Sequence, residues 1–357
     1  MVKLPRRSCY ALLARLSLER SCAGGGKARQ NQGARADFHR KSLSSLAGFS
    51  LVALALAGGH SALAVELTTR LPAYRPKIGV ERVYRVEIET SADSHGLTRA
   101  GEKSVRGEFT NSLTVLEPTL SGFKMRWRLT PKEPPPGQPS LTEIFRDRIQ
   151  AFGADMIEVE TDPRGAAKKI DNLDAMRKAV ETRIEGLKSD DPAKERLQSL
   201  LPRLQPGSLF PMDVIAPAAR LFAEAQTPEE READLGMPQT ANAEGHSNGA
   251  SVPIKLTTRY DKDEAHGFVT FTSTKVFDSN ALTEAWREVI DRETKELAAR
   301  RPEASAETLA EYSRASLTIT TTVRLSLDDG SATYAEEIVD NRIGPAFTRN
   351  VLRATRE

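Results

Sequence analysis

Three histidines follow residue 64 of this sequence, and they are the first side chains to test for chemistry. His95, His246 and His266 each lie in a stretch rich in turn-forming residues. No two of them have the H-x-x-x-H spacing that places two zinc ligands on one face of a helix. We therefore interpret all three as solvated turn histidines, and we expect no metal site built from them.

The densest group of potential metal ligands is Asp261, Asp263, Glu264 and His266. A calcium loop of the EF-hand type needs Gly at its sixth position and Glu at its twelfth. Counted from Asp261, these positions hold His266 and Thr272. We interpret the group as the charged tip of a β-hairpin, and we predict neither a metal nor another cofactor.

Nucleophilic and acid–base chemistry also lacks a convincing set of residues. The stretch from Gly245 to Gly249, GHSNG, places a histidine beside a serine, but neighbouring side chains point apart in an extended chain. Adjacent carboxylates such as Glu229-Glu230 and Glu336-Glu337 do not show the facing pair, about 5 to 10 Å apart, that glycoside hydrolysis requires. We therefore predict no catalytic residue. A hydrolase assembled from scattered Asp, Glu and His stays as a third alternative.

The segment Ser42–Ala64 predicts the compartment. It follows two basic residues, contains an apolar run over residues 46–57 and ends in Ala62-Leu63-Ala64, which is the pattern of a cleavable signal peptide. The apolar run is shorter than the ~20 residues that a membrane-spanning helix needs. Residues 1–64 are thus predicted to be an extended leader. Alternatively, the leader is shorter and its true start lies downstream of Met1. We expect cleavage near 64/65, no stable transmembrane anchor afterwards, and a periplasmic or secreted protein.

Charge and cysteine content change once the leader is set aside. Residues 1–64 contain ten of the 51 Lys and Arg residues and two of the 49 Asp and Glu residues. The remaining 293 residues therefore carry 41 basic and 47 acidic side chains, which gives a net charge of −6. A net-acidic chain without a dense basic block argues against nucleic acid as a partner. Both cysteines, Cys9 and Cys22, lie in the leader. The exported chain therefore has no disulfide and no thiolate site.

Alternating apolar and polar residues predict a series of β-strands. The clearest covers residues 123–129, in which four apolar residues alternate with Lys and Arg. Asp329-Gly330 predicts a two-residue hairpin between the last two strands. The predicted strands are Val83–Thr90, Ser104–Glu117, Phe123–Leu129, Ala154–Thr161, Val252–Tyr260, Gly267–Phe277, Leu317–Leu327 and Ala332–Val339.

Helices are predicted where apolar residues recur every three or four positions. Ser140 and Glu143 have the S-x-x-E spacing of a capping box at a helix start. Leu173–Leu187 carries one apolar stripe, and Asp191-Pro192 predicts the start of a following helix. Further predicted helices cover Met212–Glu224, with a break at Pro217, a segment capped by Ser279 or Asn280, and Glu303–Tyr312.

The order of these elements favours an α+β fold, a mainly antiparallel β-sheet with helical insertions packed on one face. Strands precede and follow the helices without a βαβ rhythm, which argues against a doubly wound sheet. We predict a single domain over residues 65–357, with a helical insert at 171–225 and a flexible loop at 226–251. The loop prediction rests on a polar, Gly-rich composition. The closing strands are expected to complete the sheet begun at Val83.

Export and the missing catalytic patterns together favour a non-catalytic binding or structural protein. Its partner would be an envelope protein or an apolar small molecule. The second hypothesis is a carrier of an apolar ligand such as a lipid, held in a sheet-lined cavity near Trp127 and Met125. The competing interpretation of these two residues, together with Phe123 and Trp286, is ordinary hydrophobic core.

Overall fold

The computed structural model describes residues 68–93, 103–133, 140–189, 191–227, 229–247, 250–300, 305–311, 313–344 and 346–357. The predicted leader and His95 lie outside these residues. The strands are β1 (Thr68–Leu71), β2 (Glu81–Asp93), β3 (Lys103–Thr119), β4 (Gly122–Pro131), β5 (Met156–Thr161), β6 (Ala167–Ile170), β7 (Arg231–Asp234), β8 (Gln239–Ser247), β9 (Ala250–Asp263), β10 (Phe268–Phe277), β11 (Ala315–Ser326), β12 (Ala332–Ile343) and β13 (Ala346–Arg356). The helices are α2 (Leu141–Phe152), α3 (Leu173–Glu185), α4 (Pro192–Gln198), η2 (Leu201–Arg203), α5 (Phe210–Ile215), α6 (Ala219–Ala225), α7 (Ser279–Ala285), α8 (Arg287–Arg300) and α9 (Ala306–Glu311).

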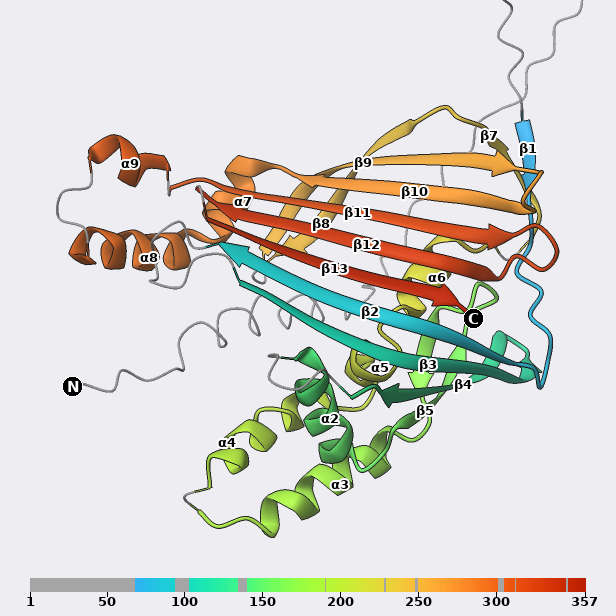
Figure 1. Cartoon of the computed structure of the whole chain (residues 1–357), viewed down its shortest axis with the longest axis horizontal. Coiled ribbons are helices and arrows are strands. Elements are labelled where there is room, and N and C mark those ends of the chain that lie inside the picture. The colour runs from blue at the N-terminus through green and yellow to red at the C-terminus, as the bar shows by residue number, and fades with distance from the viewer. Residues whose placement is uncertain are drawn as a thin grey trace, which may run out of the picture.

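A large sheet forms the centre of the molecule (Figure 1). Its eleven strands have the order β6-β5-β4-β3-β2-β13-β12-β11-β10-β9-β8, and a separate two-stranded sheet joins β1 to β7. Neighbouring strands of the large sheet pair antiparallel throughout. The mainly antiparallel sheet predicted from the sequence is confirmed, and the helices are insertions between its strands.

The strand β4 shows why these segments become strands. Met125, Trp127 and Leu129 are buried, whereas Arg126 and Arg128 between them are exposed. A period of two buries one face of a strand and leaves the other in solvent. The same pattern correctly predicted β2, β3, β5, β9, β10, β11 and β12.

The first long strand and the last strand lie side by side in the middle of the sheet. Val86 of β2 is opposite Ala354 of β13, and Ile88 is opposite Leu352. The closing strands therefore complete the sheet that begins near Val83, as predicted. They do so through β13, which the sequence pattern did not predict.

Two predictions about connections are wrong. The segment predicted as a flexible loop, residues 226–251, contains β7, which pairs with β1, and β8, which pairs with β9. Its composition is polar because β8 has the last place in the sheet and its residues Gln239–Glu244 are exposed. The two-residue hairpin predicted at Asp329-Gly330 is replaced by a five-residue connection, 327–331, between β11 and β12.

The starts of α2, α4 and α7 follow local capping rules. The side chains of Ser140 and Asp191 each accept a hydrogen bond from a backbone N–H at the start of α2 and α4. Asp278 caps α7 with a hydrogen bond of 2.8 Å, so the prediction of Ser279 or Asn280 as the cap is wrong. The helices α3 to α6 lie within residues 171–225. Among the described helices, none combines the length and the apolar character needed to cross a bilayer.

Two hydrophobic clusters meet the same face of β11. The larger cluster packs α5 and α6 on the sheet and includes Val323 and Leu325, and the smaller packs α7 on it and includes Ala315 and Leu317. Because side chains alternate along a strand, these odd-numbered residues share one face. Thr321 lies between the two pairs on that face and is also buried. We call this face of the sheet the inner face.

Candidate functional site

The predicted group of metal ligands lies at an exposed hairpin tip. His266 Nδ1 is 2.8 Å from Asp263 Oδ2, and this hydrogen bond is the main reason that the pKa of Asp263 lies below its usual value. Asp261 and Glu264 form ion pairs with basic neighbours on the same strand. Across the described ranges, no three His, Cys, Asp or Glu side chains converge as metal ligands would.

The stretch from Gly245 to Gly249 has the G-x-S-x-G spacing of a nucleophile elbow, but the structure gives it another role. An elbow places its serine on a sharp turn from a strand into a helix, whereas Gly245 and Ser247 lie within β8. His246 lies between them in the same strand. Ser247 Oγ accepts a hydrogen bond of 2.8 Å from Trp286 Nε1, so this serine satisfies a buried indole.

The adjacent carboxylates are bound by arginines. Arg220 donates two hydrogen bonds to Glu337, of 2.7 and 2.5 Å, and Arg353 donates one of 2.6 Å to Glu336. The two carboxylates point to opposite faces of β12 because side chains alternate along a strand. They therefore do not form the facing pair of a glycosidase. In the pair Glu229-Glu230, Glu230 accepts a hydrogen bond from the exposed side chain of Arg75.

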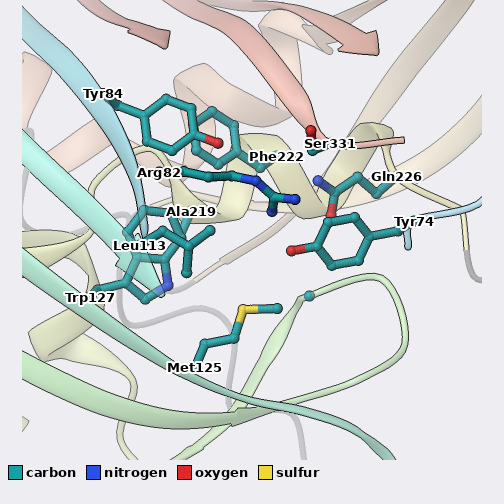
Figure 2. A pocket seen from close by; sticks show the side chains of 11 residues that line it. Tyr74, Arg82, Tyr84, Leu113, Met125, Trp127, Ala219, Phe222, Gln226 and Ser331 are labelled. Carbon is teal, nitrogen blue, oxygen red and sulfur yellow. The ribbon is translucent and has the colours of Figure 1, made fainter. Parts of the chain in front are cut away.

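Trp127 and Met125 lie in packed core. Figure 2 shows them among the aromatic and polar side chains that enclose a small void. The volume of this void is about 10 Å³. A single water molecule needs about this much space, so an apolar ligand does not fit there. The assignment of both residues to ordinary core is confirmed, with Phe123 packed against the same cluster, whereas Trp286 belongs to the smaller cluster.

Arg82 brings a positive charge into this core. Its side chain is 2% exposed, and its guanidinium lies 3.0 Å from a carboxylate oxygen of Asp329. Burial acts to raise the pKa of Asp329, but hydrogen bonds from Ser331 and the charge of Arg82 outweigh it and hold this pKa below its usual value. Figure 2 shows the guanidinium beside Tyr74 and Gln226. Because the ion pair is enclosed by protein, we assign it a structural role.

A ligand-sized groove lies instead on the inner face of β8, β9 and β10. Its volume is about 350 Å³, which lies near the lower end of the range for small-molecule sites. Gln239, Thr258 and Ser273 form its polar floor, in register across the three strands. The apolar side chains beside this row are Leu256, Tyr260 and Phe271.

The helix α6 and the strand β7 contribute the walls of this groove. Glu224 of α6 forms an ion pair of 2.8 Å with Lys275. Arg231 of β7 donates a hydrogen bond to the hydroxyl of Tyr260, and its guanidinium lies 5.5 Å from the centre of that ring. Burial raises the pKa of Tyr260, and the charge of Arg231 acts in the opposite direction. The remaining wall residues are Glu232, opposite Arg70 in the β1–β7 pairing, and Ala233.

Two buried hydroxyls, one in the floor of the groove and one on the neighbouring strand, have no hydrogen-bond partner within the described part of the chain. Ser273 and Thr321 are each 1% exposed and lie directly opposite each other on β10 and β11. An unpaired buried polar group costs about 1–3 kcal/mol. The next residue in this row is Glu337 of β12, which Arg220 of α6 binds. The row forms a polar band between the two hydrophobic clusters.

The sequence carries one signal for this site. On the inner face of β10, Val269, Phe271 and Phe277 are interrupted by Ser273 and Lys275. Two polar side chains in an otherwise apolar alternation indicate a position where each of them needs a hydrogen-bond or ion-pair partner. The other side of the groove could not be anticipated, because the sequences of β7 and β8 have the polar composition of a loop.

No family model matches the sequence, and no curated protein is similar to it. Among solved structures, the chain is similar to lipovitellin, in a structure described as "Lipid-protein interactions in lipovitellin", with 12% sequence identity and a TM-score of 0.39. The similar region covers 79% of this chain and 25% of the lipovitellin chain, so the chain spans about a quarter of that protein's length. A likeness at this level carries no argument about function, which has to be inferred from the groove.

Proposed function

We propose that the protein is an exported, non-catalytic binding protein that holds one small amphipathic ligand in the groove on β8, β9 and β10. The observation that carries this proposal is a groove of about 350 Å³ whose floor includes the buried, unpartnered hydroxyl of Ser273. If this side chain rotates towards the groove, a ligand that donates or accepts a hydrogen bond there would remove the cost of the unpaired group. Export is proposed from the leader pattern of residues 42–64.

The lining favours a ligand with an apolar body and an uncharged polar group. Leu256, Tyr260 and Phe271 offer aliphatic and aromatic surface, while Thr258 and Ser273 offer hydroxyls. The wall charges already have partners or opposite charges within the protein, so they offer little to an ionic head group. The volume fits one hydrocarbon chain or a small ring system better than a lipid with several chains. An apolar-ligand carrier is therefore the form of binding protein that this groove supports best.

Native mass spectrometry of the purified protein tests this proposal. We expect a reproducible adduct, which organic extraction releases for identification. Thr258→Trp should fill the groove and reduce the adduct at least tenfold. Thr257→Trp is the matched control, because the neighbouring residue points to the opposite face of β9, where its hydroxyl lies 3.4 Å from that of Thr240.

Binding of the uncharged fluorescent probe N-phenyl-1-naphthylamine gives a second measurement when no ligand copurifies. The probe should bind the unmodified protein and the Thr257→Trp variant alike, and Thr258→Trp should weaken its binding at least tenfold. Circular dichroism of both variants checks that the fold is intact. Equal binding by the two variants, or no binding by the unmodified protein, would contradict the proposal.

A further inference from the structure

The two edges of the large sheet differ in how they are protected. The edge strand β6 has four residues, two of them exposed lysines, Lys168 and Lys169. Its register with β5 is interrupted between Glu160 and Thr161. Short length, lysines and irregular register are the devices by which proteins prevent an edge strand from pairing with another chain.

The opposite edge strand, β8, has none of these devices. It is nine residues long and contains no Pro, Lys or Arg. It pairs with β9 in an unbroken register from Gln239 to Ser247. Residues Gln239–Glu244 are all exposed, and β8 ends the sheet order of the described residues. The backbone groups on its outer side are therefore available to another strand.

We propose that β8 pairs antiparallel with β8 of a second copy of this chain, with Ala243 on the two-fold axis. This register overlaps all nine residues and places the strand's one acidic residue, Glu244, opposite Asn242, so no like charges face each other. On the inner face it places Ala241 opposite Gly245 and Ala243 opposite itself, and these small residues leave room for close approach. An antiparallel pair related by a two-fold axis closes on itself and forms a dimer rather than a fibre.

The pairing joins the two binding grooves. Gln239 of β8 is part of the groove floor, so the inner faces of the two sheets become continuous across the new strand pair. A strand pair of this length buries less surface than the ~1,200–2,000 Å² of a stable interface, which predicts a dimer that dissociates on dilution. The proposal does not depend on the ligand, because it rests on the edge strand alone.

Disulfide trapping tests both the pairing and its register. In the full chain with Cys9→Ser and Cys22→Ser, every introduced thiol is the only one present. Ala243→Cys places two thiols directly opposite each other, within the distance that a disulfide spans. We expect this variant to form a covalent dimer on mild oxidation. Thr240→Cys is the control, because in this register residue 240 faces residue 246 and not itself, and it should crosslink at least tenfold more slowly.

Sedimentation velocity of the cysteine-free protein provides the second measurement. The average mass should rise towards that of a dimer with concentration, and Ala243→Lys should abolish the rise by placing two positive charges opposite each other. Equal crosslinking of the two cysteine variants would overturn the register. A monomer at all concentrations without crosslinking of Ala243→Cys would overturn the dimer and leave β8 as a site for a different chain.

Discussion

At the scale of single residues, Ser273 carries a buried hydroxyl that costs the folded protein stability. Its hydroxyl lies on an inner face that Val269 and Phe271 otherwise make apolar, and it has no partner within the described residues. An apolar or smaller residue would suit the folded protein better. The proposed ligand would supply the partner that this hydroxyl lacks.

Replacing this serine should separate the two effects. Ser273→Ala removes an unpaired buried group, so we expect the free energy of unfolding to stay equal or rise by about 1 kcal/mol in urea titrations. Ligand binding should weaken by up to about tenfold, which corresponds to about 1.4 kcal/mol. Thr274→Ala, on the opposite face of β10, should leave binding unchanged. A loss of stability with unchanged binding would show that the hydroxyl has a partner inside the protein.

At the scale of elements, the connection between β11 and β12 links distant parts of the chain. Asp329 of this connection binds Arg82 at the start of β2, and its backbone carbonyl accepts a hydrogen bond of 2.8 Å from the N–H of Arg75. Gly330 has φ 65°, and a Cβ there would lie 2.4 Å from the carbonyl oxygen of Ala73. The connection is thus held against the segment that joins β1 to β2.

Breaking the ion pair should destabilise the protein in a pH-dependent way. Asp329→Asn leaves Arg82 buried without its counter-ion, so we expect a loss of about 3 kcal/mol at pH 7. The pKa of Asp329 is lower in the folded state than in the unfolded chain. The stability that its ionised carboxylate contributes is therefore complete above the unfolded pKa near 4, and it is lost as the pH falls through the folded pKa. Urea unfolding at pH 7 and pH 3 should show a smaller pH effect in the variant. Asp328→Asn, an exposed neighbour, should behave like the unmodified protein.

Elements with one regularly buried face were predictable, and the strands β8 and β13, which lack such a face, were not. β4 and β11 alternate because one face meets the clusters and the other meets solvent. β8 is exposed and reads as a loop, while β13 is flanked by β2 and β12 and shows no regular alternation in its sequence. The groove uses β7, β8 and the polar interruption in β10, so it could be predicted from the sequence only at Ser273 and Lys275.

At the scale of the whole molecule, the signal peptide proposed for the N-terminal residues predicts both where the protein is found and where its mature chain begins. We expect the intact mass of protein from the extracytoplasmic fraction to correspond to a chain that begins at Val65. Leu46→Arg and Leu54→Arg together should keep the protein inside the cell, because two charges break the apolar run of the signal peptide. A mass that includes residues before Ala64, or extracytoplasmic recovery of this variant, would contradict cleavage at this position.

The central place of β13 has a consequence for the time course of folding. It is the last of the described strands along the sequence, yet it lies between β2 and β12 in the middle of the sheet. Until it is available, β2 and β12 both lack a neighbour, and contacts between residues so distant in the chain form slowly. The newly made chain would therefore stay without a closed sheet until β13 has been synthesised, and an incompletely folded chain of this kind is what the proposed export through a secretion channel would require.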